Sequence, residues 1–226
     1  LTGDVAPTTL STGATLFHEH VGRGDVELAL EELRQCAFNG LGCIVDAATG
    51  RRTLEQREVL NRIANFWFEQ TADLVANQVI EVPDPNVTVA RELDMLPVEV
   101  VVRAYLTGSS DTSAWTHYAR GVREFCGVTL PEGMIKNQPF DAPIITPTTK
   151  SEDHDESISP QQIVGRGLVE KDLWEKIESV ALALFARGTE LAARQGLILV
   201  DTKYEMGLDA DGTLTVADEI HTPDSS

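Results

Sequence analysis

Two neighbouring runs near the end of the chain read Leu197-Ile-Leu-Val-Asp-Thr-Lys-Tyr-Glu205 and Thr213-Leu-Thr-Val-Ala-Asp-Glu219. Both contain many of the apolar and β-branched residues that favour strands. The polar segment Asp209-Ala-Asp-Gly212 between them is typical of a turn. The sequence therefore predicts a β-hairpin and, with it, an antiparallel sheet.

One face of this hairpin is charged. Side chains alternate along a strand that rises about 3.3 Å per residue, so Asp201, Lys203 and Glu205 share one face. Asp218 on the second strand can bring a further carboxylate to them. The residues alone leave two interpretations open. One is a cross-strand ladder of salt bridges on a solvated face, and the other is a set of carboxylates that hold Mg²⁺ beside a phosphate-binding lysine.

A further strand is expected at residues 98–106, where Val100-Val-Val-Arg-Ala-Tyr-Leu106 places Arg103 inside an apolar run. A guanidinium in this setting needs an anionic partner, because its desolvation without one is costly. The Gly108-Ser109 turn that follows can offer backbone N–H and hydroxyl groups to a phosphate. Arg103 and Ser109 are thus candidate phosphate contacts, and a buried structural ion pair of Arg103 is the alternative.

The other segments after residue 65 add helices and a loop. Residues 172–194 repeat apolar side chains at helical spacing, and Gly196 follows at a position suited to end the helix. Phe66-Trp-Phe68 opens a second amphipathic segment, which we expect to remain helical to about residue 80. Residues 127–150 contain many Pro, Gly and Thr and are expected to form a long loop. Together with the hairpin, these segments predict an α+β fold with an antiparallel sheet and flanking helices.

The first part of the chain has a different pattern and carries a candidate metal-binding pair. His18 and His20 lie two residues apart on a strand-like run, so both imidazoles share one face, as two metal ligands from one strand must. A solvated strand end gives the same spacing. Strands and helices alternate here in the β-α-β-α order of a parallel sheet, with elements expected at residues 15–21, 26–38, 41–48 and 53–64.

The composition excludes several classes of partner. The 226 residues carry 36 acidic and 18 basic side chains, a formal net charge of −18, so no broad basic surface is expected for nucleic acid or an anionic membrane. No apolar run reaches the roughly 18 residues that a membrane span needs. Three cysteines without a CxxC pair favour a reducing cytoplasm. The oligomeric state is left open, and a homo-oligomer is one of the alternatives.

Six motifs follow one another from residue 66 to the end of the chain. They are Phe66-Trp-Phe-Glu69 with Thr71-Ala-Asp73, Val101-Val-Arg-Ala-Tyr-Leu-Thr-Gly-Ser109, Ile145-Thr-Pro-Thr-Thr-Lys150, His154-Asp-Glu-Ser-Ile-Ser159, Leu199-Val-Asp-Thr-Lys-Tyr-Glu205 and Asp218-Glu-Ile-His-Thr-Pro-Asp-Ser-Ser226. In this order they resemble the SAICAR synthetase family, the phosphoribosylaminoimidazole-succinocarboxamide synthases of purine biosynthesis. The resemblance implies an ATP-grasp-like α+β body.

The resemblance also implies a reaction and its small-molecule partners. Members of this family join L-aspartate to the carboxylate of carboxyaminoimidazole ribonucleotide, using ATP to form an acyl phosphate first. ATP and Mg²⁺ are the implied cofactors. Carried over by motif, Arg103 and Ser109 correspond to contacts of the ribonucleotide's phosphate and carboxylate. Asp201 and Lys203 correspond to polar groups of the substrate site, which we take as the catalytic pair, and Glu205 and Asp218 correspond to ligands of Mg²⁺·ATP.

The first 60 or so residues resemble a different family. They lack the Gly-Lys strand and the Arg-Ile-Ser-Ala-Phe-Asp-like segment with which SAICAR synthetases begin. Instead, Gly3-Asp-Val-Ala-Pro7, Gly13-Ala-Thr-Leu-Phe-His-Glu-His20 and Gly42-Cys-Ile-Val-Asp46 resemble the opening of phosphotriesterase-related amidohydrolases, which are metal-dependent TIM barrels. In that family the metal-binding pair corresponds to His18 and His20.

We therefore expect a chimeric chain of two incomplete parts. Residues 1–65 form an amidohydrolase-like segment, and residues 66–226 form a SAICAR synthetase-like domain without its N-terminal ATP lobe and C-terminal end. ATP-dependent ligation is the predicted function, although both missing ends belong to ligand-contacting regions. The alternatives are a divalent-metal-dependent, phosphotriesterase-like hydrolase and a non-catalytic nucleotide-binding remnant.

Overall fold

The computed structural model of the chain describes residues 54–84, 87–110, 113–150, 156–223 and 225–226. The two strands and the first helix expected before residue 53 lie outside these ranges, and so do His18 and His20. None of the helices in the described part of the chain is long and apolar enough to cross a membrane.

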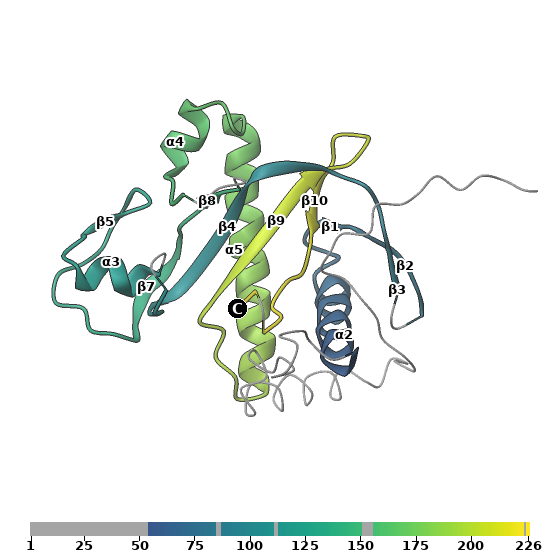
Figure 1. Ribbon diagram of the computed structural model, residues 1–226, viewed down its shortest axis with the longest axis horizontal. Coiled ribbons are helices and arrows are strands. Elements are labelled where there is room, and N and C mark those ends of the chain that lie inside the picture. The colour runs from purple at the N-terminus through teal and green to yellow at the C-terminus, as the bar shows by residue number, and fades with distance from the viewer. Residues whose placement is uncertain (1–53, 85–86, 111–112, 151–155, 224) are drawn as a thin grey trace, which may run out of the picture.

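A six-stranded sheet forms the centre of the fold (Figure 1). Its order is β1-β10-β9-β4-β7, and the short strand β8 also pairs with β4. All pairings are antiparallel except that of β1 with β10. The strands are β1 (Ala76–Asn77), β4 (Asp94–Leu106), β7 (Gln138–Ile145), β8 (Thr148–Thr149), β9 (Asp201–Leu208) and β10 (Leu214–Ala217).

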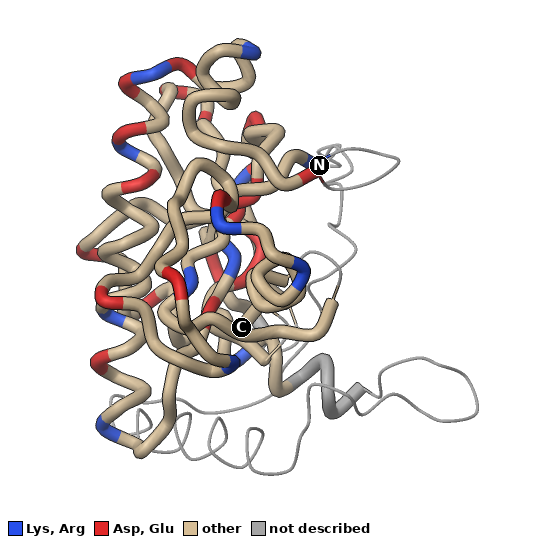
Figure 2. Tube along the Cα trace, turned by 90° about the vertical axis from the view of Figure 1, so that its left-hand side faces the viewer, with Lys and Arg blue, Asp and Glu red and all other residues tan. Residues whose placement is uncertain are grey.

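Helices and two small hairpins surround this sheet. The long helix α5 crosses behind β4 and β9, and α2 lies at the side of the sheet that carries β1 (Figure 1). Acidic and basic positions are distributed along α5, as expected for a helix with one solvated face (Figure 2). The helices are α2 (Leu54–Gln70), α3 (Ala114–Ala119), α4 (Pro160–Gly165) and α5 (Lys171–Arg194). The hairpins pair β2 (Val79–Asp84) with β3 (Val87–Ala90) and β5 (Glu124–Phe125) with β6 (Val128–Thr129).

The predicted α+β class, the terminal hairpin and the long helix are confirmed. The turn between β9 and β10 is held by Asp209, whose Oδ1 accepts hydrogen bonds from the backbone N–H groups of Asp211 and Thr213. Gly212 in this turn has φ +77°, a conformation that favours glycine. The hairpin strand begins at Asp201, four residues later than expected, and β4 begins at Asp94, four residues earlier.

Two expectations for the middle of the chain are wrong. The helices expected at 53–64 and 66–80 are one continuous helix, α2, which ends at Gln70 and is followed by β1 and β2. The boundary expected between residues 65 and 66 thus falls inside α2. The segment after residue 70 is rich in β-branched residues, whose preference for strands outweighs the amphipathic pattern.

The loop expected at 127–150 contains three strands, β6, β7 and β8. Prolines in β7 suggested a loop, because proline cannot donate to a strand ladder. However, β7 lies at the edge of the sheet and pairs only with β4, in a register that is interrupted between Arg103 and Tyr105. An edge strand tolerates Pro139 and Pro143 for this reason.

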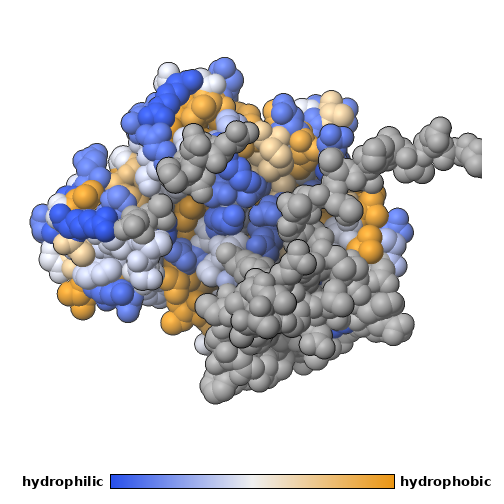
Figure 3. Space-filling view, in the orientation of Figure 1, coloured by the Kyte–Doolittle hydropathy of each residue, from blue (hydrophilic) through white to orange (hydrophobic). Residues whose placement is uncertain are grey.

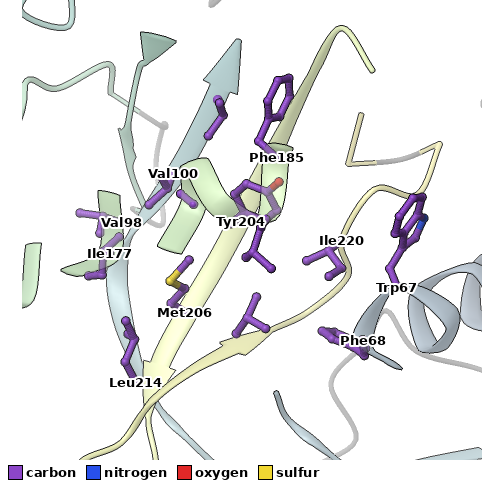
Figure 4. Packing of buried hydrophobic residues seen from close by; sticks show 14 of the residues in the cluster. Trp67, Phe68, Val98, Val100, Ile177, Phe185, Tyr204, Met206, Leu214 and Ile220 are labelled. Atoms are coloured by element: carbon purple, nitrogen blue, oxygen red, sulfur yellow. The ribbon is translucent and has the colours of Figure 1, made fainter. Parts of the chain in front are cut away.

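The core lies between the sheet and α5 (Figure 4). On β4, Val98, Val100 and Val102 are at most 3% exposed, and on β9 Tyr204 and Met206 are at most 1% exposed. These side chains pack in one cluster with residues of α5 that include Ile177 and Phe185, and with Trp67 of α2. Since side chains alternate along a strand, the residues between these positions face away from the core. The same alternation therefore presents the charged residues of β4 and β9 on the opposite side of the sheet.

Candidate functional site

The charged residues of β4 and β9 are brought together by the register of the two strands. Arg103 is opposite Asp201, Val101 is opposite Lys203, and Glu99 is opposite Glu205. Directly opposed residues of an antiparallel pair point to the same side of the sheet. Hydrophilic residues accordingly gather at the centre of the molecule, over β4 and β9, in the view of Figure 3. We call the following set the charged face: Glu99, Arg103, Lys150, Asp201, Lys203, Glu205 and Asp218.

Arg103 forms an ion pair with Asp201 at one end of the charged face. Its Nη1 lies 2.8 Å from Asp201 Oδ2, and its Nε donates a hydrogen bond of 2.9 Å to Thr146 Oγ1. The Arg103 side chain is 12% exposed and that of Asp201 26%. The ion pair that was the alternative interpretation of Arg103 is therefore present, and it fixes the orientation of the guanidinium.

Lys203 lies at the centre of the charged face. Its Nζ is 3.4 Å from Glu99 Oε1, 3.5 Å from Glu205 Oε1 and 4.0 Å from Asp218 Oδ2. The structure thus confirms the shared face of Lys203 and Glu205 that the alternation of the sequence predicted, and Asp218 brings the further carboxylate to it. A single ammonium group among three carboxylates leaves the cluster with excess negative charge.

A second lysine balances part of this charge. Lys150 follows β8, and its Nζ donates to Glu205 Oε2. Glu99 also accepts a hydrogen bond of 3.5 Å from Thr148 Oγ1. Lys150 was not among the predicted site residues, although it ends a motif that carried the family resemblance. Its approach depends on the pairing of β8 with β4, which brings a distant part of the chain to this face.

The pKa values of the two opposed glutamates shift in opposite directions. Burial raises the pKa of Glu99, against the positive charge of Lys203, and the negative charge of Glu205 raises it further. Burial acts in the same sense on Glu205, but the hydrogen bond and charge of Lys150 and the charge of Lys203 outweigh it, so the pKa of Glu205 is lowered. The opposed pair therefore has one readily ionised carboxyl and one that retains its proton to higher pH.

The pKa values of Lys203 and Asp218, the other two members of the central cluster, are also shifted. Burial opposes the charged form of Lys203, but the negative charges of Glu99, Glu205 and Asp218 outweigh it and raise the pKa of the ammonium. Burial raises the pKa of Asp218, and Glu205 adds to this effect against the attraction of Lys203. Lys203 is consequently a fixed cation at neutral pH and is unsuited to remove a proton.

Ser109 lies apart from these contacts. It is exposed in the loop after β4 and takes part in none of the ion pairs described above. The preceding Gly108 has φ +105°, and a Cβ atom there would lie 2.3 Å from Cβ of Ser113. Glycine at position 108 is thus required by the backbone of the loop, and a phosphate contact of Ser109 stays a prediction.

The charged face offers oxygen ligands for a metal ion, but its described residues do not form a complete metal site. Within the described residues, no group of three or more His, Cys, Asp or Glu side chains is arranged to hold a metal ion. Mg²⁺ is commonly bound by one or two carboxylates together with substrate phosphates, and the carboxylates of Glu205 and Asp218 suit that kind of site. His18 and His20 lie outside the described residues, so their metal site stays a prediction.

His221 belongs to the core and not to the charged face. It is 4% exposed, with Tyr204 Oη 2.6 Å from its Nε2. Trp67 packs edge-on against its ring at a centroid distance of 4.7 Å. Complete burial lowers the pKa of His221 to about 3, so the imidazole is neutral in the folded protein.

Sequence reasoning missed Glu99, Thr146 and Lys150. Glu99 had a usable signal, because it lies four residues before Arg103 on the same strand and therefore on the same face. Thr146 and Lys150 had no such signal, since their segment was expected to be a loop. Only the strand pairing shows which face they approach.

A SAICAR synthetase family model matches residues 45–226 of the chain. The phosphoribosylaminoimidazole-succinocarboxamide synthase of Legionella pneumophila (strain Lens) is 53% identical over 169 residues, which cover 75% of this chain and 54% of that protein. Among solved structures, the SAICAR synthase of Saccharomyces cerevisiae complexed with SAICAR has a TM-score of 0.65 and 30% identity, covering 75% of this chain and 60% of that one. A type-2 SAICAR synthetase in complex with ADP has a TM-score of 0.58 and 25% identity, covering 71% of this chain and 62% of that one. The chain thus spans about half the length of the curated relatives it matches.

Proposed function

The chain belongs to the SAICAR synthetase family, and on this premise we propose that it takes part in the ATP-dependent joining of L-aspartate to carboxyaminoimidazole ribonucleotide. The observation that carries the proposal is the charged face itself. It sets Arg103 and Lys203 among carboxylates on one side of β4 and β9, within the part of the chain that the family model matches. Two similar structures are complexes with SAICAR and with ADP, which belong to the same chemical classes as the proposed product and nucleotide.

The proposed reaction has two steps. A carboxylate oxygen of the ribonucleotide attacks the γ-phosphorus of ATP, the bond from that phosphorus to the ADP oxygen breaks, and an acyl phosphate forms. The amine of aspartate then attacks the acyl carbon, inorganic phosphate leaves with the electron pair of the broken C–O bond, and the nitrogen loses a proton as the amide forms. Both steps gather anionic groups, so cations directed at them lower the barrier.

Arg103 and Ser109 are proposed to bind the phosphate and carboxylate of the ribonucleotide. The guanidinium of Arg103 is oriented by Asp201 and Thr146, and an oriented fork matches the geometry of an oxyanion. Asp201 acts both as a polar group of the substrate site and as the partner that holds Arg103. Ser109 lies beyond the end of β4 and offers an exposed hydroxyl.

Lys203 is proposed to act as a permanent positive charge beside the reacting groups. Its raised pKa keeps it protonated, so it stabilises negative charge and does not serve as the base for the aspartate amine. Asp201 is its proposed catalytic partner on the same face of β9.

Glu205 and Asp218 are proposed to hold Mg²⁺ together with the phosphates of ATP. When bound, Mg²⁺ supplies positive charge that neutralises the transferred phosphoryl group. Lys150 and Lys203 lower the pKa of Glu205 against its burial, so its carboxylate is ionised at neutral pH. Three further predictions still rest on the sequence alone. They are the cytoplasmic location, a homo-oligomeric state, and the division into an amidohydrolase-like segment at 1–65 and a synthetase-like domain at 66–226.

The experiment is release of ADP from ATP by the purified 226-residue chain, measured with each substrate omitted in turn. Ligation requires that ADP release depend on both aspartate and the carboxylated ribonucleotide, and that Lys203→Ala abolish it. Lys176→Ala, a change of the same kind at an exposed position of α5, is the control and should retain the wild-type rate.

Two other results would contradict ligation. Thermal stabilisation by the ribonucleotide without any ADP release would indicate the nucleotide-binding remnant. Zinc-dependent ester hydrolysis that is lost in His18→Ala would indicate the hydrolase.

A further inference from the structure

Asp218 reaches the charged face by leaving the regular strand conformation. The last residue of β10, Ala217, is opposite Glu205 and therefore points to the same side of the sheet as Glu205. One more residue of regular strand would place Asp218 opposite Tyr204, whose side chain lies in the core. Instead, Asp218 has φ +59°, and its Oδ2 lies 4.0 Å from Lys203 Nζ. The left-handed backbone at this position thus turns the carboxylate away from the core.

This conformation is unfavourable for a residue with a Cβ atom and needs support from its surroundings. Gln78 supplies such support, from 140 positions earlier in the sequence. Its Nε2 donates a hydrogen bond of 2.9 Å to the backbone carbonyl of Asp218, and its Oε1 accepts one of 3.2 Å from the backbone N–H of the same residue. A single side-chain amide therefore binds both backbone polar groups of Asp218.

Gln78 is itself firmly held. It directly follows β1, which pairs with β10 in parallel, and its backbone N–H donates to the carbonyl of Val216 at 3.1 Å. Its own carbonyl accepts a hydrogen bond of 2.8 Å from the backbone N–H of Arg91. With its backbone anchored on both sides, the Gln78 side chain has a fixed origin from which to reach Asp218. The short strand β1 explains why this origin lies beside the end of β10.

We propose that Gln78 is a positioning residue, which holds Asp218 in the left-handed conformation that directs its carboxylate onto the charged face. The consequence for the reaction rests on the proposed role of Asp218 in binding Mg²⁺·ATP. In this proposal Gln78 acts through the backbone of Asp218, to which its side-chain amide is bound at both polar groups. Its removal should therefore weaken metal-dependent nucleotide binding to the extent that Asp218 contributes to it.

The first experiment needs no ligand. Hydrogen exchange of the Asp218 amide is compared between the wild-type chain and Gln78→Met, which retains the length of the side chain but removes both hydrogen bonds. Exchange should accelerate by about tenfold or more at Asp218, because its amide loses its acceptor, while the amides of Thr215 and Val216 in β10 remain as slow as before. Equal exchange of the Asp218 amide in both proteins would overturn the proposal.

Gln78→Glu is the second variant. It retains an acceptor for the Asp218 N–H but cannot donate to the carbonyl, so its Asp218 amide should exchange at an intermediate rate. Circular dichroism is used to verify that each variant is folded. If Gln78→Met fails to fold, the comparison of Gln78→Glu with the wild-type chain decides in its place, and unchanged exchange there counts against the proposal.

The second experiment separates positioning from a general structural role. Binding of ADP is measured with Mg²⁺ and with a chelator, for the wild-type chain, Gln78→Met, Asp218→Asn and the double variant. If Gln78 acts through Asp218, each single change should weaken the Mg²⁺-dependent affinity by about tenfold, and the double variant should be no weaker than Asp218→Asn. Additive losses, or losses equally large in the chelator, would show that Gln78 acts by another route and would overturn the positioning role.

The two proposals fail in different ways. If Asp218→Asn leaves the Mg²⁺-dependent affinity unchanged, or the wild-type chain shows no such affinity, the metal-binding role of Asp218 is wrong, and the exchange experiment alone decides whether Gln78 holds the backbone. If Asp218→Asn weakens binding and Gln78→Met does not, the role of Asp218 stands and that of Gln78 is wrong.

Discussion

Glu99 and Glu205 lie directly opposite each other on β4 and β9, and both are largely buried on the charged face. Like charges in opposed positions repel each other. Here Lys203 contacts both carboxylates and Lys150 contacts Glu205 alone, so the two glutamates are unequal. Their pKa values move apart, upward at Glu99 and downward at Glu205. This difference predicts opposite effects of the same conservative change.

Glu99→Gln should stabilise the protein at neutral pH. A carboxyl whose pKa is raised in the folded state stabilises folding below its unfolded pKa, and this contribution is lost as the pH rises through the folded value. At pH 7 the ionised carboxylate of Glu99 therefore destabilises the folded state, and glutamine removes this effect. Denaturant unfolding should show a gain of about 1 kcal/mol or less at pH 7 and none near pH 4. A loss of stability at pH 7 would contradict this prediction.

Glu205→Gln should destabilise the protein at neutral pH and also weaken the binding of Mg²⁺·ATP. A lowered folded pKa gives stability above the unfolded pKa, which is lost as the pH falls through the folded value. The variant should lose about 1 kcal/mol at pH 7, because the lysine partners of Glu205 are partly exposed to solvent. Its affinity for Mg²⁺·ATP should fall about tenfold or more in calorimetric titration. Unchanged nucleotide affinity would mean that the charged face is only a ladder of salt bridges.

Arg103→Lys should weaken ribonucleotide binding although the charge is retained. Lysine cannot bind Asp201 and Thr146 while it presents a planar fork to an oxyanion. We expect a loss of affinity of about tenfold or more in equilibrium binding of the ribonucleotide. Thermal unfolding without ligand is the control, and a large loss of stability there with unchanged affinity would support a purely structural ion pair.

Gly188→Ala should destabilise the fold, although alanine is the better helix former. Gly188 lies within α5, and a Cβ atom there would meet the His221 ring at 2.4 Å. The ring is buried and cannot retreat, so overpacking should cost about 1–3 kcal/mol. Gly165→Ala in α4 is the matched control, because no heavy atom lies within 4 Å of its new Cβ. Equal stabilities of the two variants in denaturant unfolding would refute this account of Gly188.

His221 should make the protein sensitive to mild acid. Burial lowers its pKa to about 3 in the folded state, whereas the unfolded chain takes up the proton near pH 6.5. Stability conferred by the neutral imidazole is thus lost as the pH falls from about 6.5 toward 3, at up to about 1.4 kcal/mol per pH unit. His221→Asn should flatten the pH dependence of the unfolding free energy in this window. His117→Asn is the control, and an equal flattening there would contradict the assignment.

The sequence by itself determined the elements whose pattern is local. The apolar stripe of α5 and the alternation in β4 and β9 each follow from the period of one element, and they were predicted correctly. The charged side of the hairpin was predictable for the same reason, because Asp201, Lys203 and Glu205 are two residues apart on one strand. The six motifs added the family, which a match over residues 45–226 confirmed.

Only the tertiary structure decided which distant residues complete the site. Lys150 and Gln78 act on Glu205 and Asp218 through strand pairings that join parts of the chain 55 and 140 positions apart. The left-handed turn at Asp218 is likewise held by another segment. Local periodicity carries no information on such pairings. The strands involved, β1 and β8, have two residues each, which is too short for an alternation of apolar and polar side chains to be recognised.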